Sequence, residues 1–169
     1  MTGDVLFDGH GWRVTLASAP LPDGRVKTMA RARRSDTVHI LAVPAPGRML
    51  LLREFRPHFG AYVWMLPSGK IDKEADPLQA AQRELREETG YRAETLEPYG
   101  TCHHAEGLIW TSYFFIARTL SPDPLEQDAH ELIEVHNLSL DEAIERVLSS
   151  SHVHTASAYA LLRYARENG

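Results

Sequence analysis

Residues 77–89 form the segment that most restricts the fold of this chain. The segment is rich in Ala, Gln, Glu, Leu and Arg, lacks the alternation of a strand, begins with Pro77 after Asp76 and is followed by Gly90. Helices accept proline in their first turn, are often capped by aspartate and often end at glycine. The sequence therefore predicts a helix over residues 77–89, with Asp76 as its N-cap and Gly90 as its stop.

Short strand-like runs surround this helix. Before it, β-type runs at residues 12–16, 25–29, 37–43 and 49–55 are separated by turn signals, which predicts strands joined by hairpins. After it, aromatic and β-branched residues predict strands near residues 94–101, 112–117 and 132–137, and helical spacing predicts helices over 139–148 and 155–167. The expected class is α+β, a mixed sheet packed with helices and preceded by a β-rich segment of residues 1–34.

Composition narrows the classes of function. A chain of 169 residues fits one domain over residues 1–169, and no apolar run approaches the roughly 20 residues of a membrane span. We see no signal peptide at the start, so we expect a cytoplasmic protein without a membrane partner. The net charge of −5 argues against a nucleic-acid partner, and the single Cys102 excludes an intramolecular disulfide or a thiolate zinc cluster.

Three glutamates gather on one face of the expected helix. At about 100° per residue, Glu84, Glu87 and Glu88 fall within roughly 100° of arc. The adjoining apolar stripe consists of Leu78, Ala81 and Leu85. Carboxylates spaced this way repel one another, and a hard divalent cation such as Mg²⁺ would reverse that repulsion. The alternative is a solvated acidic face balanced by the arginines of the same helix, Arg83 and Arg86.

This segment resembles the Nudix box, G-x5-E-x7-R-E-U-x-E-E-x-G-U, in which U is a bulky apolar residue. Gly69 and the stretch RELREETGY at residues 83–91 match its second half in residue type and spacing. The resemblance implies a Nudix-type α/β/α sandwich in which Glu84, Glu87 and Glu88 bind the catalytic Mg²⁺, with Mn²⁺ as the alternative metal. It further implies that the Ser68 carbonyl is another metal ligand and that Arg83 orients the cluster.

One position departs from the box. Its first glutamate falls at Ala75, with Glu74 immediately before it. In the family this glutamate supports the architecture and is not generally a metal ligand, so we expect weaker support and not a loss of catalysis. Either Glu74 takes its place after a small shift of the loop, or the start of the helix is held in another way.

Beyond the box, the chain is similar to the ADP-ribose pyrophosphatase-like branch of the family, through residues 36–38, 53–57, 66–69, 131–135 and a terminal helix after Thr155. That branch implies a general base on a late acidic loop, here Glu131 with Glu134 as its rival. It also implies substrate contacts from Arg53 and Arg56, for which an edge-strand salt bridge is the alternative. Relatives of this kind form homodimers in which N-terminal strands reach the partner's site, so a homodimer is expected, with residues 1–34 as the dimerisation element.

Departures from the branch leave the substrate open. This chain has Ala105-Glu106-Gly107 and then Thr111 where the branch shows Ser-Pro-Gly followed by Glu, and Met65 where it often has Glu. Other residues that could contact a nucleotide are the basic cluster Arg31, Arg33 and Arg34, the neighbouring His103 and His104, and Trp12, Trp64 and Trp110, for which ordinary surface or core positions are the alternatives.

The expected function is Mg²⁺-dependent hydrolysis of a small nucleotide, ADP-ribose or another nucleotide sugar, to a nucleoside monophosphate and a sugar phosphate. Three alternatives remain from the sequence. The first is a Nudix-type domain that binds or senses a nucleotide without cutting it. The second is a Nudix hydrolase of nucleoside triphosphates or dinucleoside polyphosphates, and the third is a structural domain with a solvated acidic helix.

Overall fold

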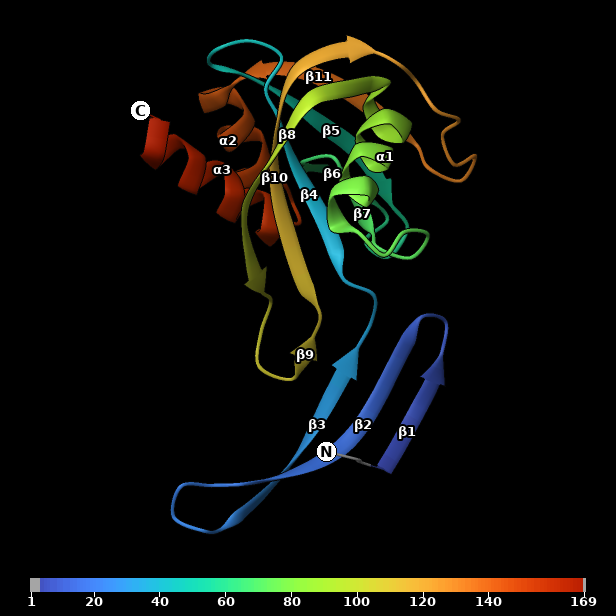
Figure 1. The fold of residues 1–169 in the computed structure, drawn as a ribbon, viewed down its shortest axis with the longest axis vertical. Coiled ribbons are helices and arrows are strands. Elements are labelled where there is room, and N and C mark those ends of the chain that lie inside the picture. The colour runs from blue at the N-terminus through green and yellow to red at the C-terminus, as the bar shows by residue number, and fades with distance from the viewer. Residues whose placement is uncertain (1–3, 169) are drawn as a thin grey trace.

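The computed structural model describes residues 4–168, and its central feature is a seven-stranded sheet (Figure 1). Its main path has the order β11-β5-β4-β10-β8, with β6 paired to β5 and β7 paired to β4. The strands are β4 (Thr37–Ala42), β5 (Arg48–Arg56), β6 (Ala61–Met65), β7 (Ser68–Lys70), β8 (Tyr91–His103), β10 (Thr111–Pro122) and β11 (Ile133–Ser139). β4 and β10 are parallel and the other pairs are antiparallel, so the sheet is mixed, as expected.

Strand β4 lies in the middle of the molecule, and all six of its residues are buried. When both faces of a strand are covered, side chains on either face are shielded from water. The sequence of such a strand is therefore a nearly continuous apolar run. Val38, Ile40 and Ala42 point to one core, and Leu41 with the following Val43 points to the other.

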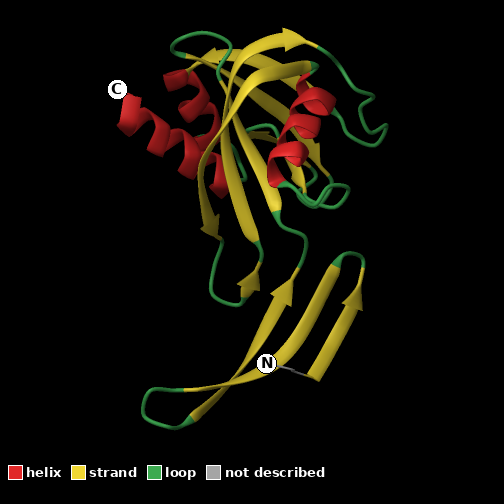
Figure 2. Cartoon of the chain, viewed as in Figure 1, coloured by secondary structure: helices red, strands yellow, loops and turns green. Residues whose placement is uncertain are grey.

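Helix α1 (Pro77–Thr89) covers one face of the sheet through Ala80, Ala81 and Leu85 (Figure 2). The Asp76 side chain accepts a hydrogen bond from the Leu78 amide, and Gly90 adopts the left-handed conformation at the C-terminus. The expected bounds and caps are therefore confirmed. Leu78, on the same stripe, lies in the first turn and is 39% exposed, whereas Ala81 and Leu85 are buried.

Helices α2 (Leu140–Leu148) and α3 (Thr155–Asn168) cover the opposite face (Figure 2). Their buried residues belong to the second core, the one that contains Leu41 and Val43. These residues are Ala143, Val147, Ala160 and Leu161. Ser139 begins α2 with a capping box in which Glu142 reciprocates the hydrogen bond. With α1 on one side and this pair on the other, the molecule is the expected α/β/α sandwich.

A second sheet projects from the sandwich (Figure 1). It has the order β1-β2-β3-β9 and consists of β1 (Asp4–Gly9), β2 (Trp12–Pro20), β3 (Val26–Arg33) and β9 (Leu108–Ile109). Among the described residues of this sheet, Ala17 is the one buried apolar side chain, and Val5, Leu6, Phe7 and Val26 are exposed. The expected β-rich N-terminal segment is therefore present, and it leaves much of its apolar surface in contact with solvent. Among residues 4–168, no helix is long and apolar enough to cross a membrane.

Candidate active site

The glutamate face of α1 rests directly on Gly69 in strand β7. A Cβ atom added to Gly69 would lie 2.0 Å from the Glu84 carboxyl carbon, far inside the contact limit. Only glycine leaves room for this carboxylate against the backbone. The Glu84 carboxylate occupies the space that a side chain at position 69 would fill. The occurrence of Gly69 and Glu84 together in the sequence thus has a steric cause.

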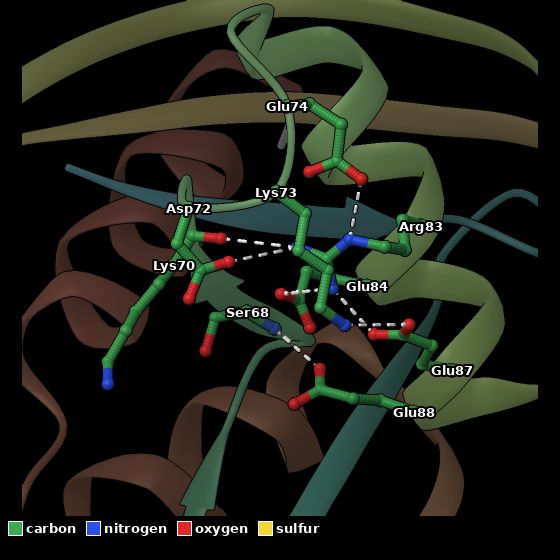
Figure 3. Close-up of polar contacts among 9 residues, drawn as sticks. All are labelled: Ser68, Lys70, Asp72, Lys73, Glu74, Arg83, Glu84, Glu87 and Glu88. Atoms are coloured by element: carbon green, nitrogen blue, oxygen red, sulfur yellow. Dashed lines mark hydrogen bonds and ion pairs between the residues drawn. The ribbon is translucent and has the colours of Figure 1, made fainter. Parts of the chain in front are cut away.

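Arg83 joins the loop before α1 to the carboxylates on the helix (Figure 3). Its Nη1 lies 2.8 Å from Glu84 Oε1 and 2.6 Å from Glu87 Oε2, and its Nη2 donates to the Lys70 carbonyl. Burial alone would lower the pKa of this guanidinium, but Glu74, Glu84 and Glu87 raise it above its ordinary value. Arg83 is therefore a fixed cation that holds two of the three glutamates in place.

Glu74, and not Ala75, contacts the arginine of the glutamate cluster. Its Oε1 accepts a hydrogen bond of 2.8 Å from Arg83 Nε, whereas Ala75 lies on the surface. Glu74 thus supports Arg83 while Asp76 caps the start of the helix, so the structure has features of both alternatives that the sequence leaves.

Glu88 is the most buried acid of the cluster, with 5% exposure. Its Oε2 accepts a hydrogen bond of 2.7 Å from the Ser68 amide (Figure 3). Burial, followed by repulsion from Glu84, raises the pKa of Glu88 well above its ordinary value. Burial also raises the pKa of Glu84 to about 7, against the opposing effect of Arg83. Because these neighbouring carboxyl groups have raised pKa values, additional positive charge beside them would stabilise their ionised forms.

The donor set suits a hard cation. Glu84, Glu87, Glu88 and the Ser68 carbonyl would offer only oxygen, which Mg²⁺ and Mn²⁺ prefer. Arg83 engages one oxygen each of Glu84 and Glu87, and Lys73 Nζ lies 3.4 Å from the other oxygen of Glu87. Among residues 4–168, no group of three acidic, histidine or cysteine side chains converges closely enough to hold a metal ion.

A cavity of about 670 Å³ opens beside this cluster. Glu84, Glu87 and Glu88 line one part of it, and Arg56 and Glu131 line it from other elements. Burial, followed by repulsion from Asp128, raises the pKa of Glu131. The structure therefore brings Glu131 to the same space as the three glutamates of α1.

Glu54, which the sequence analysis did not single out, is buried next to this space on β5. Its carboxylate lies 2.8 Å from Arg56 Nη2, and burial raises its pKa. An acidic residue inside the run of residues 53–57 is a signal that could have identified it, since a charged side chain on a central strand needs a partner.

Two further predicted site residues lie outside the cavity. Arg53 Nη1 is 2.8 Å from Glu134 Oε1, and the Arg53 guanidinium stacks over Tyr62. Neither Arg53 nor Glu134 lines the cavity of this chain. The arrangement is the salt bridge between neighbouring strands that the sequence analysis weighed as the alternative, so a substrate contact by Arg53 is not seen in the single chain.

Histidines also line the cavity, and His39, His104 and His154 form its histidine wall. His39 is 4% exposed, and the His39 and His154 ring centroids are 5.5 Å apart. His104 also lines the cavity, whereas its neighbour His103 is exposed. Burial lowers the pKa of His154 to about 4 and that of His39 well below its ordinary value. The sequence analysis missed His39 and His154, because they and His104 come from three separate parts of the chain.

The tryptophans have different positions. Trp12 and Trp110 meet edge to face at 5.7 Å, and the Arg34 guanidinium lies about 5.5 Å from each ring. Trp12 is 37% exposed, so the core position considered for it was wrong. Trp110 lines the cavity, whereas Trp64 packs against the second core. Arg34 lines the cavity too, which singles it out from the basic cluster at residues 31–34.

Comparisons with known proteins agree with this geometry. The NUDIX domain family matches residues 33–159. The chain is 28% identical over 161 residues to an ADP-ribose pyrophosphatase of Bacillus subtilis (strain 168), covering 94% of this chain and 87% of the relative. It is 29% identical over 161 residues to the CMP-5'-(N-acetyl-N-hydroxy-3-aminopropyl)phosphonate hydrolase of Streptomyces rubellomurinus (strain ATCC 31215), covering 94% and 77%.

The fold matches the crystal structure of an ADP compounds hydrolase with a TM-score of 0.80 and 21% identity, covering 99% of this chain and 92% of that one. The family match spans most of the chain and includes the glutamate helix and Gly69. These similarities identify an enzyme, a pyrophosphohydrolase. The chain therefore belongs to the Nudix hydrolase family, in its ADP-ribose pyrophosphatase-like branch.

Proposed function

We propose that this enzyme hydrolyses the diphosphate of ADP-ribose or another nucleotide sugar with Mg²⁺, giving a nucleoside monophosphate and a sugar phosphate. One observation supports the proposal above the others. Three carboxylates, one of them seated on Gly69, share a cavity with a fourth on another element, Glu131. The identity of the substrate rests on the relatives, one of which is an ADP-ribose pyrophosphatase.

Glu84, Glu87, Glu88 and the Ser68 carbonyl would hold the metal. When bound there, Mg²⁺ would polarise the phosphates and acidify a bound water. Arg83 positions Glu84 and Glu87, since its guanidinium contacts one oxygen of each carboxylate and both residues line the cavity. The Ser68 amide fixes Glu88 in the same way.

Glu131 is the proposed general base. It lines the cavity, and its raised pKa reflects burial beside other acids, a setting in which a carboxylate takes up a proton readily. Glu134 is a weaker candidate, since it is exposed and the hydrogen bond from Arg53 lowers its pKa. Arg56, which also faces the cavity, is the proposed contact for the anionic phosphates.

The experiment compares the hydrolysis of ADP-ribose by wild type and by Glu87→Gln. The products, a nucleoside monophosphate and a sugar phosphate, are identified and quantified. Glutamine keeps the size of the side chain but removes its charge, so turnover should fall by orders of magnitude while the circular dichroism spectrum stays unchanged. The exposed Glu94→Gln, on β8, is the matched control and should keep full activity. A fully active Glu87→Gln enzyme would refute the assignment.

The specificity is tested with a panel of nucleotides. ADP-ribose, other nucleotide sugars, nucleoside triphosphates and dinucleoside polyphosphates would be compared at equal concentration in Mg²⁺ and in Mn²⁺. The highest kcat/KM should belong to a nucleotide sugar. A preference for triphosphates would contradict the substrate proposed here and leave the metal-dependent hydrolysis standing.

We further propose that the enzyme is a homodimer formed through its N-terminal sheet. Val5, Leu6 and Phe7 are each about half exposed on a strand whose sheet buries little of its own apolar surface. Such a sheet gains stability mainly by covering that surface with another chain. A second copy is the occupant we favour, since the sheet projects away from the sandwich and these apolar side chains lie exposed on it (Figure 1).

A further inference from the structure

Strand β5 carries a buried carboxylate beside the cavity. Glu54 is 4% exposed, and among residues 4–168 no group donates a well-aligned hydrogen bond to its Oε2 atom. The positive charge that offsets its burial belongs to Arg56, whose Nη2 lies 2.8 Å from this oxygen. A buried ion pair seldom stabilises a fold more than apolar side chains of the same volume. Stability alone therefore does not explain a glutamate at this position.

The two faces of β5 separate its charged residues. Successive side chains of a strand point to opposite faces, so Glu54 and Arg56 share one face and Arg53 lies on the other. Arg53 pairs with Glu134 outside the cavity, whereas Arg56 lines the cavity. Glu54 thus contacts the arginine that faces the cavity.

One nitrogen of Arg56 is held from two sides. Its Nη2 lies 2.8 Å from Glu54 Oε2 and donates a hydrogen bond of 3.1 Å to Met65 Sδ. Both partners are buried, whereas the Arg56 side chain is 37% exposed. A guanidinium carries five N–H donors on three nitrogens, so contacts at one nitrogen leave donors for phosphate oxygens. Glu54 and Met65 fix the arginine without using up its capacity to bind an anion.

Another acid competes for this guanidinium. Glu131 lines the same cavity, and burial and Asp128 raise its pKa while Arg56 opposes them. The two charges therefore attract each other across the cavity. An arginine released from Glu54 would be drawn toward Glu131 and away from the wall formed by β5 and β6.

We infer that Glu54 is a positioning residue, which holds Arg56 against this wall so that the guanidinium meets the diphosphate of the substrate. The inference rests on the proposed function, in which Arg56 contacts the phosphates. It needs a negative charge next to Nη2 and does not depend on which strand supplies that charge. Because Met65 Sδ contacts the same nitrogen, a carboxylate at position 65 would serve equally well.

The first test removes the charge of Glu54 and keeps its size. Glu54→Gln should raise KM for ADP-ribose about ten-fold, the value of one charge-assisted hydrogen bond, with kcat within about two-fold of wild type. Its melting temperature should not fall, because a buried charge is removed. The exposed Glu97→Gln, on β8, is the matched control and should keep the wild-type constants. An unchanged KM in Glu54→Gln would overturn the inference.

A double-mutant cycle tests whether Glu54 acts through Arg56. Arg56→Gln should lower kcat/KM at least as much as Glu54→Gln does. Adding Glu54→Gln to Arg56→Gln should change kcat/KM by less than about two-fold, because the residue that Glu54 positions is already gone. Losses that multiply would show that Glu54 serves only the structure of the strand.

Moving the carboxylate tests the geometry. Met65→Glu in the Glu54→Gln background places an acid beside the same Arg56 nitrogen and should return KM to within about three-fold of wild type. Met65→Gln in that background has a similar size but no charge, so KM should stay raised. Equal recovery in both variants, or none in a folded Met65→Glu enzyme, would overturn the inference. If the melting curve shows that Met65→Glu does not fold, the double-mutant cycle decides alone.

Binding of inorganic pyrophosphate separates this effect from the proposed reaction. Calorimetry with Mg²⁺ present should give a Kd about ten-fold higher for Glu54→Gln than for wild type, and no such increase in the Arg56→Gln background. If wild type hydrolyses no nucleotide sugar, the proposed function fails, and the pattern in Kd still decides whether Glu54 positions Arg56.

Discussion

Gly69 links the local backbone geometry to the candidate active site, because the Glu84 carboxylate packs directly against it. Gly69→Ala would drive a methyl group into the Glu84 carboxylate at 2.0 Å, so the helix or the loop must move apart. We expect a loss of at least ten-fold in kcat/KM and a lower melting temperature. Gly9→Ala is the matched control, since the added atom there would meet only the Phe7 ring at 3.4 Å. Equal activity of the two variants would show that catalysis does not depend on the close contact between Glu84 and Gly69.

His154 makes the fold sensitive to acid. Its pKa falls from 6.5 to about 4 because it is buried and near Arg56 and His104, so the unfolded chain takes up the proton first. The stability from this ring is complete above pH 6.5 and is lost as the pH falls toward 4. The loss is up to about 3 kcal/mol.

Chemical denaturation between pH 7.5 and 4 measures this effect. His154→Gln should show a shallower fall in the free energy of unfolding than wild type over that range. The exposed His10→Gln should follow the wild-type curve. A His154→Gln curve parallel to wild type would mean that other groups carry the acid sensitivity.

The loop that leads into α1 carries an element-level prediction. Glu74 supports Arg83 at 2.8 Å, and Arg83 in turn holds Glu84 and Glu87. Glu74→Ala should therefore lower kcat several-fold with little change in the far-ultraviolet circular dichroism. Ala75→Glu alone should change little, because that position faces solvent.

The double variant Glu74→Ala/Ala75→Glu distinguishes a general need for negative charge from a need at one position. It should remain as impaired as Glu74→Ala, provided that the loop keeps its path. Recovery of activity in the double variant would show instead that the loop shifts to bring residue 75 to Arg83.

Elements with a strong local signal could be predicted from the sequence. Helix α1 was found with its bounds because Asp76, Pro77 and Gly90 each have a local reason for their positions. Strands β1, β6 and β9 were missed, because they are short or lack alternation. Pairing with neighbouring strands defines such elements, and pairing is not visible in a local window.

The same distinction holds for the site. The glutamates of α1 lie within five residues of one another, so their spacing alone indicates a common face. The histidine wall combines residues 39, 104 and 154, which only the tertiary fold brings together. Arg53 was a plausible substrate contact by its place in the chain, and its salt bridge to Glu134 depends on the pairing of β5 with β11.

The oligomeric state is the prediction that concerns the molecule as a whole. If the N-terminal sheet forms a dimer, Leu6→Lys should convert the enzyme to a monomer in sedimentation velocity, because a charge would be buried in the interface. Leu162→Lys, which alters a similarly exposed leucine on α3, should leave the mass unchanged. A wild-type protein that sediments as one chain at micromolar concentration would contradict the proposal.

Strand β4 has a consequence for the order in which the chain acquires structure. Its parallel partner β10 begins at Thr111, so the register Thr37 to Ser112 spans 75 residues. Closing so long a loop costs entropy before any contact repays it, which slows folding. During synthesis, the apolar centre of the sheet must therefore wait for more than half of the chain to leave the ribosome, and chaperones that shield extended apolar segments would act in that interval.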